Sequence, residues 1–140
     1  MDWTECRDKG IVRQTTKNQA LISNLVEAAE DKLHSSSLLP NNSRTRTSRI
    51  ALTYDAIRAL LEALAVSKGF KVYNHECFEA FLDYIMDAPQ TASLFRKARI
   101  LRNQITYFGS EVSEARVQNS LRELIIIKNE VRAFLAVKTG

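Results

Sequence analysis

The sequence predicts an all-α domain, with four or five helices in an up-and-down bundle. Three observations lead to this prediction. Apolar residues recur at helical spacing in several long segments. The 140 residues include only four Gly and two Pro, whereas a sheet protein needs many more turns. No segment shows a convincing strand pattern. The length suits one domain over residues 1–140, large enough to bury roughly 70% of its unfolded surface without a disulfide or metal.

The clearest helix begins near residue 47. Thr47 or Ser48 is expected to cap its start, and Gly69 is placed to end it. Its apolar residues follow the i, i+4, i+7, i+11, i+14 spacing of one buried helical face: Ile50, Tyr54, Ile57, Leu61 and Leu64.

Two helices are predicted before it. A short one covers residues 2–8 and ends at Gly10. The next starts near Thr15 or Thr16 and ends within the serines at 35–37. Its inner face is predicted from four residues that recur on one side: Leu21, Leu25, Ala28 and Ala29.

Three helical segments are predicted after it. The first starts after Asn74 with an apolar stripe of Phe78, Phe81, Leu82 and Ile85. The second runs from about Thr91 to Tyr107 and stops at Gly109, with Leu94, Ala98, Leu101 and Ile105 facing inward. The last starts near Ser110 or Ser113, and its inner side is formed by Val117, Leu121, Leu124, Ile125, Val131 and Leu135.

Ile126 and Ile127 widen the apolar stripe of the last helix beyond one face. Either the helix is deeply buried within the chain, or it packs on a second copy of the chain. The second alternative predicts a homodimer. Polar residues at about 36–48 predict a flexible loop that a partner could order, and residues 138–140 are also expected to be disordered.

The two cysteines and two histidines do not form a metal-binding pattern. Cys6 and Cys77 lie far apart and form no C-x-x-C pair, so we expect two reduced thiols in a cytoplasmic protein and no metal or cofactor. The first residues include acids and lack the apolar core of a signal peptide. No apolar run approaches the roughly 18 residues of a membrane helix, so no membrane association is expected.

Basic residues gather in two places, although the net charge is only +4. Arg44, Arg46 and Arg49 lie in a stretch without acids, and so do Arg96, Arg99 and Arg102. If the two clusters meet, they would form a positive cleft suited to phosphate, which arginine binds in a bidentate way. The alternative is two solvated faces, balanced by acids on the intervening helix at Glu76, Glu79, Asp83 and Asp87.

The segment Arg102-Asn103-Gln104-Ile105-Thr106-Tyr107 resembles the core motif of HEPN-family domains, an Arg followed by four to six residues and then a His. Arg102 and Asn103 match the motif, but Tyr107 occupies the position of the histidine. The resemblance extends weakly over most of the chain. It implies a HEPN-like bundle of four or five helices that dimerises near the motif. Active members are implied to be metal-independent endoribonucleases in toxin–antitoxin or defence systems, and others to be binding modules.

The missing histidine counts against catalysis. RNA cleavage through the 2′-OH needs a base that works near neutral pH, and a phenol, which ionises near pH ~10, is poorly suited. The favoured hypothesis is a catalytically impaired domain that binds RNA or a nucleotide, with Arg102, Asn103 and Tyr107 at the site and Arg96 and Arg99 extending its wall. One alternative is an interaction module that binds a nucleotidyltransferase-type partner. The other is a ribonuclease toxin in which Tyr107 replaces histidine.

Three other residues receive simpler predictions. His75 follows the expected cap Asn74, so it is predicted to be a surface or capping residue. Tyr54 is predicted to pack between helices, and Asp55 is predicted to be exposed to solvent.

Overall fold

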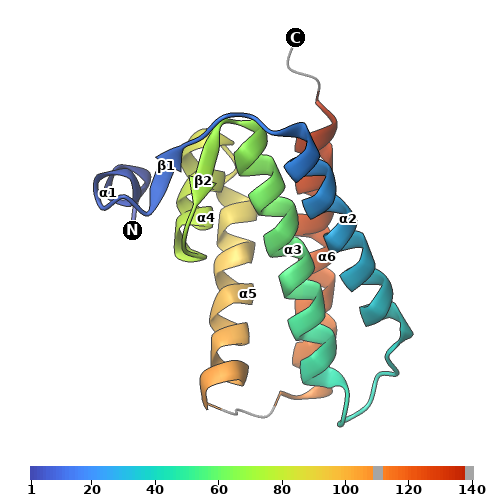
Figure 1. The fold of residues 1–140 in the computed structure, drawn as a ribbon. Helices are drawn as coiled ribbons and strands as arrows, with labels where there is room; N and C mark the ends of the chain where they lie inside the picture. Colours follow the sequence, from blue (N-terminus) through green and yellow to red (C-terminus); the bar gives the residue numbers. More distant parts are fainter. Residues whose placement is uncertain (109–111, 138–140) are drawn as a thin grey trace.

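The structure of the chain is a computed structural model that describes residues 1–108 and 112–137. Its framework is a bundle of four long helices in which each helix runs opposite to the one before it (Figure 1). The all-α prediction is therefore confirmed. The four helices are α2 (Gln19–Leu38), α3 (Arg46–Ser67), α5 (Pro89–Phe108) and α6 (Glu114–Ala136).

Helix α3 is the central helix of the bundle, packing against α2, α5 and α6. All five residues of its predicted stripe are buried, from Ile50 to Leu64. Gly69 lies just past its end with a φ of 87°, a left-handed conformation that suits glycine. The helix starts at Arg46, so the expected caps Thr47 and Ser48 lie inside it; Thr45 occupies the cap position without a side-chain capping bond.

A small antiparallel sheet stands beside the bundle, and the sequence analysis did not predict it. Strand β1 (Val12–Gln14) pairs with β2 (Phe70–Val72), with Val12 opposite Val72 and Gln14 opposite Phe70. Each strand has only three residues, too few for an alternating pattern to stand out. The pair exists because the chain turns back at Gly69 and meets the N-terminal segment.

Helix α1 (Trp3–Asp8) is attached to helix α4 (Glu76–Ala80) by a disulfide between Cys6 and Cys77, with 6.1 Å between their Cα atoms. The prediction of two reduced cysteines is therefore wrong. The cysteines are 71 positions apart, and nothing local in the sequence indicates that α1 packs on α4. Trp3 of α1 adds contacts with β2 and with the segment after α4, because its ring packs on Phe70 and Phe81.

The helix starts after residue 70 are close to their predictions. The Asn74 side chain accepts a bond of 3.0 Å from the Cys77 amide, so the predicted cap of α4 is confirmed. Helix α4 continues into a π-helical turn, η1 (Phe81–Ile85), which keeps Phe81 and Leu82 buried. Helix α5 starts at Pro89, two residues before the expected Thr91. Ser113 is the cap of α6. The predictions for Gly109, Ser110 and residues 138–140 lie outside the described residues.

Helix α2 differs most from its predicted form. It begins after Asn18, which caps it, rather than at Thr15 or Thr16. Leu21 and Ala28 are exposed, so part of its predicted inner face is wrong; Ala29 is buried, with Val26 and Leu33 packed beside it. The helix continues through Ser36, whose hydroxyl meets that of Thr53 at 2.9 Å. Helices thus occupy both ends of the predicted loop at 36–48.

Helix α6 packs on α3 and α5 through Val117, Leu124, Ile127 and Val131, which are all buried. Ile125 and Ile126 are each 47% exposed, so burial within one chain does not account for the full stripe. The homodimer stays a prediction, and these two residues are the surface it would use. None of the helices in residues 1–108 and 112–137 is both long enough and apolar enough to cross a bilayer.

Candidate functional site

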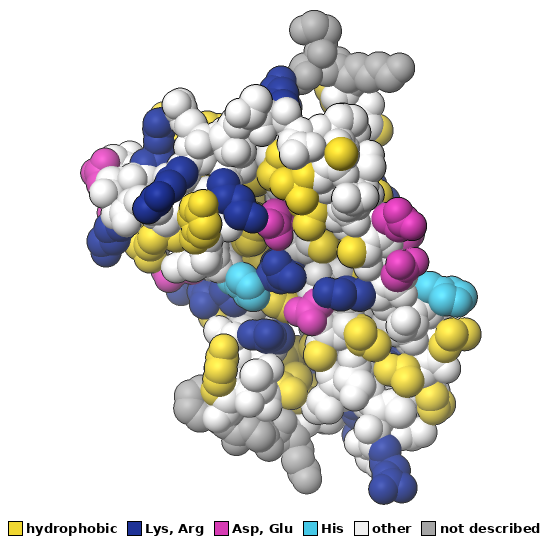
Figure 2. All heavy atoms as spheres, viewed as in Figure 1, with side chains coloured by type: hydrophobic (Ala, Val, Ile, Leu, Met, Phe, Trp, Pro, Cys, Tyr) yellow, Lys and Arg dark blue, Asp and Glu magenta, His cyan; other side chains and the backbone are white. Residues whose placement is uncertain are grey.

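A pocket of about 390 Å³ opens between helix α5 and the segment that joins β2 to α4. Figure 2 shows basic side chains gathered on the face where α3, α4 and α5 lie. The pocket unites the three residues of the HEPN-like segment with residues from elsewhere in the chain. Its lining consists of Arg99, Arg102, Asn103 and Tyr107 from α5, of Tyr73, Asn74 and His75 from the joining segment, and of Glu76, the first residue of α4.

Helical spacing explains why the residues of α5 meet at one pocket. Arg99, Arg102 and Asn103 are three and four positions apart, and Tyr107 follows Asn103 by four, so all lie on neighbouring turns of one face. Leu101, on another side of α5, is buried in the bundle. The helix therefore uses one face for the core and an adjacent one for the pocket.

Arg102 is half-buried, and its guanidinium lies 5.6 Å from the centre of the Tyr54 ring. This is a cation–π distance. Within the described residues Arg102 forms no ion pair with any carboxylate. The guanidinium is thus held against an aromatic face, while its N–H donors are not engaged by an acid. This arrangement suits an anionic ligand.

Tyr54 supports the site from beneath. It is fully buried, and its ring stacks on Phe95 with the centroids 5.5 Å apart. Its hydroxyl lies 2.9 Å from Nδ1 of His75. Burial raises the pKa of the Tyr54 phenol, so it stays neutral at physiological pH. Tyr54 therefore holds two residues of the pocket, Arg102 by its ring and His75 by its hydroxyl.

His75 has a different role from the predicted one. It stands at the start of α4, but its side chain makes no capping bond because Asn74 performs that function. Burial lowers the pKa of His75 from 6.5, and the positive charges of Arg58 and Arg102 lower it further, while Asp55 acts in the opposite direction. A neutral imidazole thus lies in the same pocket as Arg102. No sequence signal indicated this, since Tyr54 and His75 are 21 positions apart.

This burial predicts a pH dependence of stability. The folded chain binds fewer protons at His75 than the unfolded chain, so the free energy of unfolding should decrease as the pH falls through 6.5 and level off below the lowered pKa. Urea unfolding of the wild type and of His75→Gln at a series of pH values measures this. The wild type should lose more stability than the variant in that range. Identical slopes would contradict the assigned burial.

The other predicted arginines are distributed differently. Arg99 lines the pocket, but its Nε lies 2.6 Å from Oε1 of Glu79, so an acid of the intervening helix balances it, as the solvated-face alternative predicted. Arg96 is exposed and lines a separate pocket beside Met1 and Tyr84. Among the described residues, Arg102 is therefore the main unpaired cation that lines this pocket. Arg96 and Arg99 do not extend the pocket wall as further unpaired cations.

The second arginine cluster lies just before α3, at Arg44, and at the start of α3, at Arg46 and Arg49, and it contributes nothing to the lining of this pocket. Arg44 is exposed, and Arg46 lies 3.7 Å from Glu114 of α6. Two nitrogens of Arg49, Nε and Nη1, are buried without a hydrogen-bond partner within the described residues. The expected single cleft formed by both clusters is therefore not observed at this pocket.

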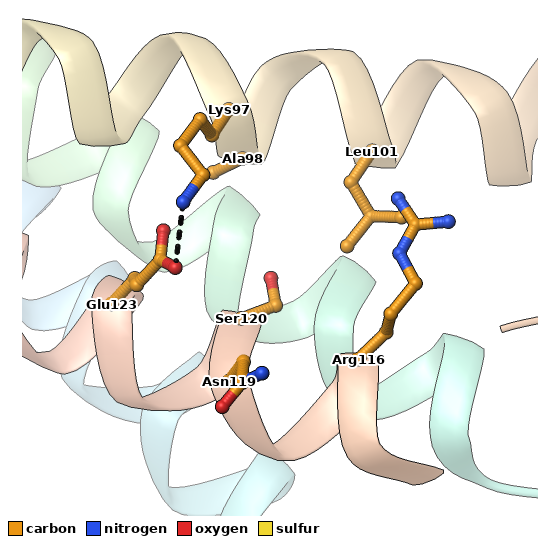
Figure 3. A pocket seen from close by; sticks show the side chains of 7 residues that line it. All are labelled: Lys97, Ala98, Leu101, Arg116, Asn119, Ser120 and Glu123. Carbon is orange, nitrogen blue, oxygen red and sulfur yellow. Dashed lines mark hydrogen bonds and ion pairs between the residues drawn. The ribbon is translucent and has the colours of Figure 1, made fainter. Parts of the chain in front are cut away.

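A second hollow, of about 200 Å³, lies between α5 and α6 (Figure 3). Lys97 extends into it from α5 and pairs with Glu123 of α6 at 2.9 Å, and Arg116 stands at the other end. One of its two cations is thus already neutralised. No group of three or more His, Cys, Asp or Glu side chains is arranged to hold a metal in the part of the chain that the structure describes.

Comparisons of the chain with known proteins do not extend this description. No family model matches the sequence, and neither a curated protein nor a solved structure is similar to it at a significant level.

Proposed function

We propose that the Arg102 pocket binds a phosphate group of RNA or of a nucleotide. The observation that carries the proposal is the guanidinium of Arg102, which lines an open pocket and pairs with no acid in the described residues. Arginine is the side chain best suited to a phosphate because its planar fork matches two phosphate oxygens. A half-buried site also strengthens the attraction, since it is screened less by solvent.

The neighbours of Arg102 suit the rest of a nucleotide. The Asn103 amide can both donate and accept hydrogen bonds, as a base edge or a ribose requires. The Tyr107 ring is 69% exposed, so it is available to stack on an unpaired base. The carboxylate of Glu76 at the rim is paired with the Met1 amino group at 2.9 Å, which reduces its repulsion of an anion.

Membership of the HEPN family, a role in a toxin–antitoxin or defence system and a cytoplasmic location belong to the same proposal. They are supported by the helical bundle and by the position of Arg102, Asn103 and Tyr107 in one pocket. A cytoplasmic location requires the Cys6–Cys77 bond to persist among reducing agents. Both cysteines are fully buried, which limits access of a reductant to the bond.

Replacement of Arg102 tests the proposal. Arg102→Ala is expected to weaken binding of a fluorescently labelled single-stranded RNA roughly tenfold or more, since a charge-assisted bond to phosphate is lost. Fluorescence anisotropy over a range of salt concentrations measures it. The slope of log affinity against log salt should become shallower by about one phosphate contact.

The control is Arg122→Ala, which removes an equal charge from an exposed position on α6 and should leave the affinity nearly unchanged. Arg116→Ala tests the second hollow in the same assay. If the wild type binds neither RNA nor a nucleotide, or if Arg122→Ala or Arg116→Ala weakens binding as much as Arg102→Ala does, the proposal is wrong. Absence of RNA and nucleotide binding would favour the interaction module that binds a protein partner.

A further inference from the structure

We propose that the outer face of the β1–β2 ribbon is a second phosphate site, in which Arg13 binds a neighbouring phosphate of the same ligand that Arg102 holds. The ligand is then a single strand of nucleic acid that continues from the pocket over Tyr73 to Arg13. This inference rests on the proposed function, because Arg102 must hold the first phosphate. It adds a site that lies outside the helical bundle and outside the segment from Arg102 to Tyr107.

The ribbon has a buried inner face and a polar outer face. Val12 and Val72 lie opposite each other and are buried, so they form the inner face. Arg13 lies opposite Lys71, and because side chains alternate along a strand, these two form the outer face. Tyr73 follows Lys71 by two positions and joins the same face. The valines thus fix the ribbon to the core, and two basic residues and a tyrosine lie on its other side.

Arg13 is exposed, yet two contacts hold its guanidinium in place. Its Nε donates to the carbonyl of Gly10 at 3.2 Å, and its central carbon lies 5.7 Å from the centre of the Tyr73 ring. Arg13 pairs with no acid in the described residues, and neither contact uses its two Nη groups. A guanidinium that is already positioned loses less conformational entropy when it binds a phosphate.

Tyr73 connects Arg13 with the Arg102 pocket. Its ring is 60% exposed, and it belongs to the lining of that pocket. The amino group of Lys71 also lies near this ring, at 6.0 Å, but Glu62 pairs with it. Arg13 is therefore the cation of the outer face that is left for a ligand. Tyr73 thus contacts one arginine without an acidic partner in the described residues and shares a pocket with another.

The size of the pocket indicates that a strand would extend beyond it. A volume of about 390 Å³ lies near the lower end of the usual range for small-ligand pockets, about 300–1,000 Å³. It suits one nucleotide, so the next nucleotides of a strand must lie on the surface around it. Basic and hydrophobic side chains gather there, over the ribbon and α5 on one face (Figure 2). Each wall of the pocket carries an exposed tyrosine, Tyr73 on one side and Tyr107 on the other.

The groups on this surface suit a single strand of either RNA or DNA. Guanidinium groups recognise phosphates and tyrosine rings recognise the faces of bases, and both nucleic acids offer these features. A double helix keeps its bases stacked inside, so they cannot reach Tyr73 or Tyr107. We therefore expect Arg13 to contribute equally to single strands of RNA and DNA, and little to a mononucleotide, whose one phosphate is held by Arg102.

Binding of three ligands to the full chain tests the inference: a labelled all-uridine RNA of about six nucleotides, an all-thymidine DNA of the same length, and uridine 5′-monophosphate as a competitor. Fluorescence anisotropy measures the affinities. Arg13→Ala should weaken binding of both strands about fivefold and leave the affinity for the mononucleotide unchanged. Arg102→Ala should weaken binding of all three. The salt dependence of strand binding should become shallower by about one phosphate contact in each variant.

Two further variants serve as controls. Arg7→Ala removes an equal charge from an exposed position on α1 and should leave all three affinities unchanged. Arg13→Lys keeps the charge without the planar fork, so it should recover only part of the strand affinity. Circular dichroism checks that each variant keeps its helices; if Arg13→Ala does not fold, Arg13→Gln replaces it.

The outcomes separate the two proposals. Strand binding that depends on Arg102 but not on Arg13 would overturn this inference and leave the proposed function intact. Equal losses for the strands and the mononucleotide would show that Arg13 acts on the pocket itself, and an effect on RNA alone would contradict a contact to phosphate. An equal loss in Arg7→Ala would reduce the effect to net charge. Absence of binding of all three ligands by the wild type would remove both proposals.

Discussion

Reduction of the Cys6–Cys77 disulfide is expected to lower the free energy of unfolding by about 4 kcal/mol. The cross-link joins residues 71 positions apart, and closing a loop of that length removes a large part of the conformational entropy of the unfolded chain. The folded chain also loses the covalent attachment of α1 to α4. A loss of this size is a large fraction of the total stability of a small domain.

Urea unfolding with and without a strong reductant measures the effect, followed by circular dichroism at a helical wavelength. A double Cys6→Ala, Cys77→Ala variant is the control, because it should start near the stability of the reduced wild type and not respond to the reductant. Equal stability of the oxidised and reduced wild type would contradict the expectation. Mass spectrometry after thiol alkylation confirms the state of the bond in each sample.

Phe95→Ala is expected to lower the free energy of unfolding by about 3–5 kcal/mol, the usual range for deletion of a buried aromatic ring. Phe95 is fully buried in α5, stacks on Tyr54 and meets the edge of Phe78 at 6.4 Å between centroids. The variant leaves a cavity behind the ring that supports Arg102 and His75. RNA binding should therefore weaken as well, at a temperature where the variant is still folded.

Two substitutions are controls for Phe95→Ala. Phe95→Leu keeps much of the volume and should cost less than half as much as Phe95→Ala. Tyr84→Ala removes an aromatic ring that is 70% exposed and should change the stability by no more than about 0.5 kcal/mol. A Phe95→Ala variant as stable as Tyr84→Ala would show that the ring is not part of the core. Thermal unfolding followed by circular dichroism compares all three.

The long helices could be predicted because their signal is local. On α3, five apolar residues at helical spacing are enough to define a buried face, and all five are buried. The serines at 35–37 are polar, so the sequence predicted that the helix ends among them. Ser36 is instead buried within α2, where its hydroxyl bonds to that of Thr53. A tertiary contact thus overrides a local preference, and single-sequence patterns do not contain that information.

Only those residues of the candidate site that lie on one helix could be predicted from the sequence. Arg102, Asn103 and Tyr107 share a segment, and helical spacing alone places them on one face. His75 and Tyr54 come from other segments, and only packing brings the imidazole and the phenol within 2.9 Å. The same reasoning applies to the disulfide, which joins two short helices from distant parts of the chain. Arg96 shares helix α5 with Arg102 but lines a different pocket, so membership of the same helix does not by itself place a residue at the site.

The chain around His75 is fastened on both sides by the N-terminal segment. The Tyr73 amide donates to the carbonyl of Ile11 at 2.8 Å, and Cys77 is bonded covalently to Cys6. The first twelve residues line none of the Arg102 pocket, yet they determine where one of its walls stands. A substitution or a proteolytic cut among them would thus alter ligand recognition from a distance, so variation at this end of the chain can tune the pocket without changing any residue inside it.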